Sequence, residues 1–383
     1  MNPLTLPKGC NLRCQACSHR ELGYAESLTQ KQEWLRKSLS KWESRLAPVE
    51  AAPEESRLNY RRKALLSAKV NGAYWEFGTL RRISSRSRDY ELIEIHDCPV
   101  HSEQVRKICH YFSRTLPLDI PLVYLAVSGT LVTLVLKSKT PISIPVSDFF
   151  PLGLRGVFLN LNPVAGKRVF DPRRFLKIWG EDQVEENGFF YGPASFQQLI
   201  PKLHEKTLRE AEDFFCLEGN DSVLDLCSGL GQSLARWKNH ARTLGVELSA
   251  EAVRLSGQNL GNLDLILRGK VSDRIPQLDW WQKAKPGRLL VYANPPRLGL
   301  EAKVLDWLIQ SARPAKIAYL SCSAGTLAKD LSRLEDGGYT VKRITPYDFF
   351  PQTHHVETLT SLELDSRAHI RGALSTGSNS RPQ

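Results

Sequence analysis

Apolar, strand-like segments alternate with helical segments from Ser222 to Leu364, and this alternation limits the possible folds more than any other feature of the chain. The first strand-like segment, Ser222–Leu226, runs into a loop with glycines at positions 229 and 231. A second one, Leu244–Glu247, ends in an acid roughly 20 residues further on, which is typical of βαβ units. We therefore expect an α/β domain over residues 191–364, with a Rossmann-like sheet that binds ligands at the carboxyl ends of its strands.

The later strands of this domain end in residues that can do chemistry. Arg288–Ala293 is followed by Asn294-Pro-Pro-Arg297, where two prolines fix the loop and hold the Asn294 amide at the sheet edge. Ile317–Leu320 stops at Ser321-Cys322, and leucines at helical spacing follow. Position alone leaves Cys322 either a nucleophile at the ligand edge or a small buried side chain, and Asn294 either a hydrogen-bonding group or part of a rigid turn.

The loop after the first strand favours S-adenosylmethionine (SAM) as the cofactor. Gly229 and Gly231 let the backbone approach a ligand closely, and the Glu247 carboxylate can accept hydrogen bonds from both hydroxyls of a ribose. A dinucleotide would also fit such a loop, but the G-x-G-x-x-G form is absent because position 234 is Leu. An aspartate before the loop, Asp225, and an acid ending the second strand match SAM-dependent methyltransferases better.

Three cysteines near the N-terminus, Cys10, Cys14 and Cys17, are close enough in sequence to share one soft metal centre, and an iron–sulfur cluster fits best. Cys98, expected at a strand end before a turn, is the candidate fourth ligand. Zinc is the rival metal, but its usual paired Cys-x2-Cys spacing occurs only once here.

The Cys-x3-Cys-x2-Cys spacing is also similar to the cluster motif of radical SAM enzymes. Three features argue against that class. Only nine residues precede Cys10, and Ala16 stands where those enzymes usually carry an aromatic residue. The chain also continues into one helix and short strands, whereas radical SAM enzymes continue with repeated βα units.

The charge balance indicates a polyanionic partner. Lys and Arg number 52 against 41 Asp and Glu, a net charge of +11, which favours nucleic acid over the alternative of a generally basic soluble protein. The clustered cysteines indicate a reducing compartment, and neither a signal peptide nor a membrane span is predicted. We therefore expect a cytoplasmic, monomeric protein that binds RNA and no membrane.

Two further regions complete the expected organisation. Residues 1–50 are predicted to form the cysteine segment and one helix over 28–42, with an apolar stripe of Trp34, Leu35 and Leu39. Residues 51–190 are predicted to form a central β-rich α+β domain that ends in a turn-rich β connection over 150–190, and residues 365–383 a disordered tail. Cys109 and Cys216 are assigned to apolar packing.

Basic and aromatic residues are interleaved in the central domain. They form either an RNA-contacting face or a solvated basic face, and they are Tyr60, Arg61, Arg62, Lys63, Arg81, Arg82, Arg86 and Arg88.

Five segments resemble, in this order, the RNA uracil-C5 methyltransferases, which are class I SAM-dependent enzymes that contain an iron–sulfur cluster: residues 195–198, 225–231, 294–297, 321–322 and 349–357. The resemblance implies that SAM lies among Gln198, the backbone near Cys227, Gly229 and Gly231, and the side chains of Glu247 and Asn294. It implies Cys322 as the nucleophile and Glu357 as the general base. It also implies that Cys10, Cys14, Cys17 and Cys98 ligate a [4Fe–4S] cluster.

Departures from the family pattern refine this expectation. Many members carry Asp where Asn294 stands, and many begin with a small RNA-binding β-barrel that has no room before Cys10. Both features resemble the subgroup that methylates 23S rRNA. Ile200 and Lys270 also depart from the family motifs, the first affecting base or cofactor contacts and the second adenine contacts.

The expected function is SAM-dependent methylation of C5 of a specific uridine in 23S rRNA. The Cys322 thiolate adds to C6 of the uracil, which makes C5 nucleophilic, and Glu357 later removes the C5 proton. The T-loop uracil of tRNA is the alternative substrate. A radical SAM enzyme and a non-catalytic iron–sulfur RNA-binding protein are alternatives from other classes.

Overall fold

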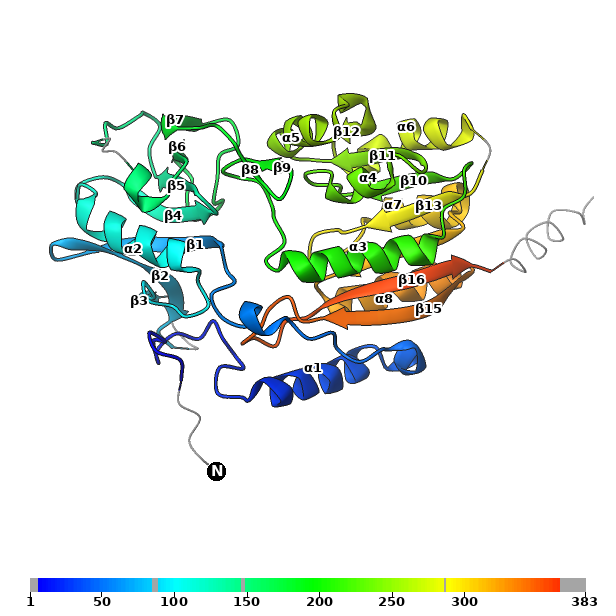
Figure 1. Ribbon diagram of the computed structural model, residues 1–383, viewed down its shortest axis with the longest axis horizontal. Helices are drawn as coiled ribbons and strands as arrows, with labels where there is room; N and C mark the ends of the chain where they lie inside the picture. Colours follow the sequence, from blue (N-terminus) through cyan, green and yellow to red (C-terminus); the bar gives the residue numbers. More distant parts are fainter. Residues whose placement is uncertain (1–5, 85–88, 146–148, 286, 366–383) are drawn as a thin grey trace, which may run out of the picture. The chain divides into compact units, whose positions relative to one another are not determined.

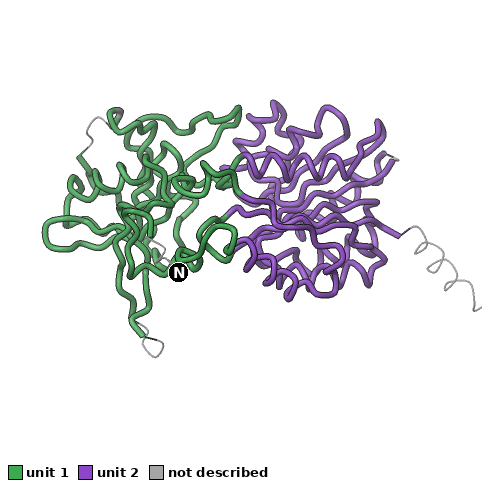
Figure 2. The backbone as a smooth tube through the Cα atoms, turned by 60° about the horizontal axis from the view of Figure 1, so that its bottom comes forward, with its two compact units in different colours: residues 1–27, 52–201, 350–354 green, residues 28–51, 202–349, 355–383 purple. Residues whose placement is uncertain are grey.

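The structure is a computed structural model that describes residues 6–84, 89–145, 149–285 and 287–365. Its chain forms two units, each made of separate stretches of sequence (Figure 2). The first unit comprises residues 1–27, 52–201 and 350–354, and the second comprises residues 28–51, 202–349 and 355–383. The expected domain boundaries differ from these units, because residues 28–51 belong to the second unit and residues 191–201 and 350–354 belong to the first.

The second unit is built on a seven-stranded sheet with the order β12-β11-β10-β13-β14-β16-β15. Strands β10 to β14 pair in parallel, and β16 pairs antiparallel with both of its neighbours. This topology confirms the Rossmann-like α/β fold. The strands are β10 Ser222–Leu226, β11 Arg242–Glu247, β12 Ile266–Arg268, β13 Leu289–Ala293, β14 Lys316–Ser321, β15 Tyr339–Tyr347 and β16 Glu357–Leu364.

Helices cover both faces of this sheet (Figure 1). Val291 and Tyr292 are neighbours on β13, so their side chains point to opposite faces. Val291 lies in the main apolar core with the leucines of α8, whereas the Tyr292 ring packs edge-to-face with Trp237 of α4, with the ring centroids 5.2 Å apart. The helices are α3 Pro201–Phe215, α4 Gln232–Trp237, α5 Ala250–Leu260, η4 Leu263–Leu265, α6 Val271–Lys283, α7 Ala302–Trp307, η5 Leu308–Ala312 and α8 Ala324–Asp336.

The N-terminal helix α1, Tyr24–Ser38, contributes to the second unit from Leu28 onward, followed by η1, Ser40–Arg45. Leu35 and Leu39 are fully buried in the main core, as expected. The prediction for Trp34 is wrong, because its side chain is 42% exposed. The residues that face the core are spaced four apart and include Lys31, Leu35 and Leu39, and Trp34 lies one position away from them on the helix.

The first unit contains a second seven-stranded sheet, with the order β3-β2-β1-β4-β5-β6-β7. Helix α2, Glu103–Thr115, begins at Ser102, whose hydroxyl accepts from the Val105 N–H, and buries Ile108 and Phe112 in the core of this unit. The strands are β1 Lys63–Asn71, β2 Tyr74–Arg82, β3 Tyr90–Glu94, β4 Leu122–Ser128, β5 Leu131–Leu136, β6 Gly156–Leu161 and β7 Phe175–Gly180, and a separate hairpin consists of β8 Val184–Glu186 and β9 Phe189–Tyr191. Short 3-10 turns are η2, Glu54–Ser56, and η3, Phe150–Leu152.

Two local predictions require correction. The region 150–190 is more than a turn-rich connection, because it contributes the fully buried strand β6, which pairs in parallel with β5. Cys216 is exposed, because it follows the last residue of α3 and its φ of 47° turns the chain out of the helix. Cys109 is buried in α2, as expected. No helix among the described residues is long and apolar enough to cross a membrane, and Arg86, Arg88 and residues 366–383 lie outside the described residues.

Candidate active site

Four of the residues singled out by the sequence lie at one edge of the sheet in the second unit. Glu247 is the last residue of β11, and Cys227, Asn294 and Cys322 each follow the last residue of a strand, β10, β13 and β14. Because these four strands run parallel, their carboxyl ends meet at the same edge.

The antiparallel pairing of β14 and β16 relates Cys322 to Glu357. Ser321 is paired with Thr358, so the next pair along this register is Cys322 with Glu357. Glu357 is 5% exposed and is the first residue of β16. Its charge raises the pKa of the Cys322 thiol, as expected for two acids that face each other.

Arg297 acts on the same thiol in the opposite direction. Burial is the main cause that raises the pKa of Cys322, and the charge of Glu357 adds to it. The Arg297 side chain lowers this pKa by its charge and by a hydrogen bond to the thiol. Sequence reasoning quoted Arg297 as part of a motif but gave it no role. The signal that could have found it is a cation beside a cysteine that must act as a thiolate.

The glycine loop after β10 is shaped by its contacts with β11. The N–H groups of Cys227 and Ser228 both donate to the carbonyl of Val246, each at 3.0 Å. Cys227 has a φ of 75° and Gly231 a φ of 81°, so the backbone turns sharply before α4 begins. The Glu247 carboxylate accepts from the Gly229 N–H at 3.0 Å and from the Ser249 N–H at 2.6 Å. The carboxylate expected to bind a ribose is therefore held against the loop.

Two buried polar atoms beneath the loop have no hydrogen-bond partner among the described residues: Oδ1 of Asp225 and Oγ of Ser228. Burial raises the pKa of Asp225 to about 7, and the Ser233 hydroxyl donates to its other oxygen. Orphaned buried acceptors of this kind are usually satisfied by water or by a bound polar ligand. The loop therefore fits a cofactor with polar groups, such as SAM.

The other cofactor candidates are placed as follows. The Asn294 N–H donates to the Leu226 carbonyl at 3.3 Å, which ties the end of β13 to the end of β10. Gln198 belongs to the first unit, between β9 and α3, and its side-chain Nε2 is buried without a partner among the described residues. Ile200 is buried, and Lys270 is exposed just before α6.

The four N-terminal candidate ligands line one cavity in the first unit, which also contains Leu58, Ile95 and Gln352. Burial, and next the charge of Cys98, raise the pKa of the Cys17 thiol to about 12. Gly9 allows the N-terminal cysteine segment to lie close to the segment that carries Cys98. A Cβ at position 9 would lie 2.2 Å from the carbonyl oxygen of Asp97, the residue before Cys98. The four cysteines are Cys10, Cys14, Cys17 and Cys98.

Arg20 closes the cysteine loop and lines the same cavity. Its guanidinium donates to the backbone carbonyls of Cys14 at 2.5 Å and Leu12 at 3.1 Å. Among the described residues, no three His, Cys, Asp or Glu side chains converge closely enough to hold a single metal ion. A four-iron cluster places one cysteine on each iron, so its ligands surround a volume and do not converge on a point.

Comparison with known proteins supports the RNA uracil-C5 methyltransferase family. Residues 287–364, which include Asn294, Cys322 and Glu357, match the family model described as tRNA (Uracil-5-)-methyltransferase. An RNA methyltransferase of Listeria monocytogenes, itself described as uncharacterized, is 27% identical over 92% of this chain and 82% of its own length. One from Caldanaerobacter subterraneus is 33% identical over 55% of this chain and 48% of its own length.

A solved structure shows the same fold as this chain. It is the tRNA (uracil-54, C5)-methyltransferase of Pyrococcus abyssi in complex with S-adenosyl-L-homocysteine. The two chains superpose with a TM-score of 0.66 at 19% identity, over 90% of this chain and 85% of the archaeal one. The likeness supports the class I methyltransferase fold of the second unit.

Proposed function

We propose that this enzyme methylates C5 of a specific uridine in 23S rRNA, with SAM as the methyl donor, Cys322 as the nucleophile and Glu357 as the general base. One observation carries the proposal. A half-buried thiol and a buried carboxyl face each other at the ends of paired antiparallel strands, with Arg297 hydrogen-bonded to the thiol.

The first step generates a nucleophilic carbon. The Cys322 thiolate adds to C6 of the uracil, the C5–C6 double bond opens, and an enolate forms whose negative charge extends to C5 and O4. Arg297 favours this step because it stabilises the thiolate. Asn294, at the adjacent strand end, is positioned to donate a hydrogen bond toward the enolate oxygen or the uracil edge.

The second step restores the uracil. After C5 has accepted a methyl group, the Glu357 carboxylate takes the remaining C5 proton, the C5–C6 double bond re-forms and the thiolate leaves C6. The products are 5-methyluridine, S-adenosylhomocysteine from the methyl donor and, after reprotonation, the free thiol. The burial of Glu357 suits this role because it keeps water away from the carbanion-like intermediate.

SAM supplies the methyl group when it is bound. The glycines at 229 and 231 would let the loop backbone approach this cofactor closely, and the Glu247 carboxylate, which here accepts from the Gly229 and Ser249 N–H groups, would accept hydrogen bonds from the ribose hydroxyls. Gln198, the backbone at Cys227 and Asn294 complete the proposed contacts.

The rRNA substrate rests on the subgroup feature Asn294. The T-loop uridine of tRNA is the second candidate, and it is favoured by the tRNA substrates named for the matching family model and for the archaeal structure. The deciding experiment is mass-spectrometric mapping of 5-methyluridine in rRNA and tRNA from cells with and without the gene. Loss of the modification from 23S rRNA alone supports the proposal, loss from tRNA alone replaces it with the second candidate, and no loss from either overturns the methylation of these RNAs.

We also propose that Cys10, Cys14, Cys17 and Cys98 hold a [4Fe–4S] cluster. The four thiols line a single cavity, and the guanidinium of Arg20 provides a positive charge beside an anionic cluster. Such a cluster ties the N-terminal segment to the β3–α2 connection and shapes the first unit. It does not serve radical chemistry, so anaerobic reduction in the presence of SAM should yield no 5′-deoxyadenosine.

A further inference from the structure

Leu298 is the most exposed large apolar side chain among the described residues. Its exposed fraction is 89%, against 73% for Trp280 and 61% for Leu248. A single exposed leucine is ordinary on a protein surface and needs no explanation by itself. Two further observations indicate a role for Leu298. Hydrogen bonds fix the backbone around it, and it lies near the proposed nucleophile.

The backbone on both sides of Leu298 is fixed by hydrogen bonds. The Thr326 hydroxyl donates to the Arg297 carbonyl at 3.0 Å, and the Gly299 N–H donates to the Pro296 carbonyl at 2.8 Å. Beyond the turn, the Leu300 N–H donates to Asp330 at 3.2 Å. Leu298 therefore lies in a turn whose backbone is fixed by hydrogen bonds.

Gly299 shows how tightly this turn is seated. Its φ is +78°, and a Cβ there would lie 2.5 Å from Oδ2 of Asp330 and 2.6 Å from Cγ2 of Thr326. Asp330 is itself held by the Tyr319 hydroxyl at 2.6 Å. The turn thus packs against α8 and β14, the two elements that flank Cys322 in the sequence. The position of Leu298 is therefore fixed by the same two elements that position Cys322.

The neighbouring residue places Leu298 at the rim of the active site. Thr326, four residues after Cys322, donates to the Arg297 carbonyl, the Arg297 side chain lowers the pKa of the Cys322 thiol, and Leu298 is the next residue in the chain. An RNA base that reaches the thiol must leave its stack, at the cost of the stacking that it loses, and an apolar side chain inserted into the vacated space can replace part of that stacking. Leucine is one of the apolar side chains that proteins insert between bases for this purpose.

We propose that Leu298 is a wedge that enters the RNA base stack when the target uridine leaves it, and that its contacts are the faces of the flanking nucleobases. This inference rests on the proposed function, because it takes the flipped uridine as given. It adds a residue that controls access of the base to Cys322 and that takes no part in the bond changes themselves. Leu298 is therefore a positioning residue.

The test compares adduct formation by Leu298 variants on two RNAs. The probe is a stem–loop transcript of the RNA found to be methylated in the mapping experiment, with 5-fluorouridine at the target position, which traps the thiol adduct because C5 has no proton to lose. The second RNA is identical except for an abasic nucleotide next to the target, so that little stacking remains to be replaced. The matched control is Leu263→Ala, another exposed leucine, which lies just before β12 at the opposite end of the sheet strands.

Leu298→Ala should slow adduct formation about tenfold on the intact RNA and less than about twofold on the abasic RNA. Leu298→Met should retain the wild-type rate, Leu263→Ala should match the wild type on both RNAs, and all melting temperatures should agree. Equal rates of Leu298→Ala and the wild type on intact RNA would overturn the wedge, and so would an equal loss on both RNAs. A wild-type enzyme that forms no adduct on either RNA would instead overturn the proposed function.

Discussion

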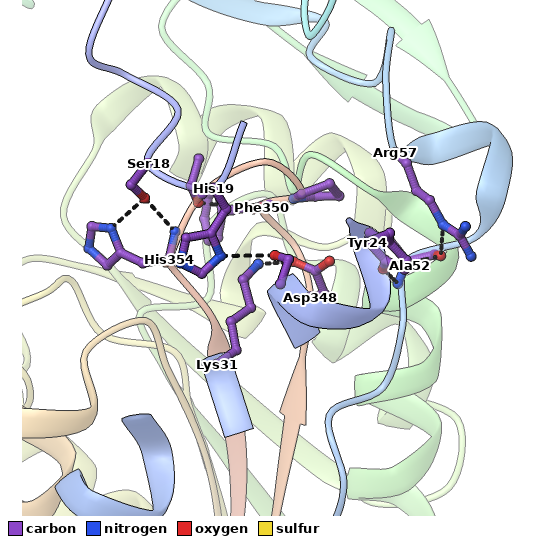
Figure 3. Close-up of polar contacts among 12 residues, drawn as sticks. Ser18, His19, Tyr24, Lys31, Ala52, Arg57, Asp348, Phe350 and His354 are labelled. Atoms are coloured by element: carbon purple, nitrogen blue, oxygen red, sulfur yellow. Dashed lines mark hydrogen bonds and ion pairs between the residues drawn. The ribbon is translucent and has the colours of Figure 1, made fainter. Parts of the chain in front are cut away.

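Ser18 and His354 are joined by two hydrogen bonds, although 336 positions separate them in the chain (Figure 3). The Ser18 hydroxyl oxygen accepts from the His354 backbone N–H at 2.9 Å and lies 2.9 Å from Nδ1 of the His354 ring. If the hydroxyl donates to Nδ1, the ring proton resides on Nε2. The next residue continues the contact, because the His19 N–H donates to the Gln352 carbonyl at 3.0 Å. Within the first unit, the segment that follows Cys17 therefore holds residues 350–354, which directly precede the stretch leading to Glu357.

Replacing Ser18 by alanine should loosen residues 350–354. Both hydrogen bonds are lost, so the backbone amides of this segment should exchange with solvent about tenfold faster, which corresponds to a loss of about 1.4 kcal/mol in the local opening free energy. Hydrogen–deuterium exchange with mass spectrometry checks this. Ser311→Ala, which removes one exposed serine hydrogen bond in the second unit, is the control. Unchanged exchange of residues 350–354 in Ser18→Ala would contradict the anchoring role.

Glu357→Gln should arrest the reaction after methyl transfer. The amide has nearly the same shape as the carboxyl but cannot accept the C5 proton, so the covalent complex between Cys322 and RNA should accumulate and turnover should fall at least about 100-fold. Denaturing gels reveal the complex. Cys322→Ala should form none, and Cys216→Ser, which alters an exposed cysteine, should behave as the wild type. Normal turnover of Glu357→Gln would assign the base to another residue.

Arg297→Ala should change the pH dependence of adduct formation. Arg297 lowers the pKa of Cys322, so its removal raises that pKa further and reduces the thiolate fraction at neutral pH. The rate should fall about threefold to tenfold near pH 7, and the deficit should shrink as the pH approaches 10, where both enzymes are increasingly deprotonated. Single-turnover rates with 5-fluorouridine RNA measure the profile. Arg297→Lys should restore part of the neutral rate, whereas a deficit of equal size at every pH would speak against this electrostatic role.

Lys31 and Asp348 form an ion pair in the second unit whose two side chains are fully buried, with Nζ and Oδ1 2.5 Å apart (Figure 3). Burial lowers the pKa of Lys31, and the charge of Asp348 acts against that shift. Lys31→Met should destabilise the protein by about 3–5 kcal/mol because it leaves a carboxylate buried without its cation. Urea unfolding measures the loss. The double variant Lys31→Met/Asp348→Leu should recover most of it, and Lys41→Met, which breaks an exposed pair with Glu335, should leave the midpoint unchanged.

Cys17→Ser should abolish the proposed cluster. Cys17 lines the same cavity as the other three cysteines, so its loss removes one of four ligands and should leave anaerobically purified protein with little iron and acid-labile sulfide. Metal and sulfide analysis, with the visible absorption spectrum, provides the measurement. Cys216→Ser should retain wild-type content. Wild-type protein that binds zinc and no sulfide would replace the cluster by a zinc site.

The sequence predicted those parts of the site that depend on local order. Cys322, Asn294 and Glu247 were placed at strand ends because apolar runs, glycines and prolines mark where strands stop. The pairing of Cys322 with Glu357 could not be predicted in the same way. It depends on the register of β14 against β16, because the last strand enters the sheet antiparallel between β14 and β15.

The buried ion pair of Lys31 and Asp348 is the second feature that the sequence did not predict. Lys31 stands four residues before Leu35 in the stripe that faces the core, and its partner Asp348 is 317 positions away in the sequence. A lysine at a core position predicts that a carboxylate lies beside it in the fold, but the sequence does not indicate which carboxylate this is. The prediction that Cys216 is buried is wrong for a more local reason. Helix α3 ends at Phe215, and the next residue, Cys216, adopts a left-handed φ.

The first unit is complete only when residues 350–354 have been synthesised. At typical elongation rates, roughly 7 to 30 s pass between the emergence of its second stretch, which ends at residue 201, and the arrival of this last one. During that interval Ser18 and His19 lack the contacts described above, and the cysteine cavity lacks Gln352 from its wall. A ribosome that stalls between residues 201 and 350 therefore holds a chain with an unfinished cysteine cavity, so the state of that cavity reports whether residues 350–354 have been translated.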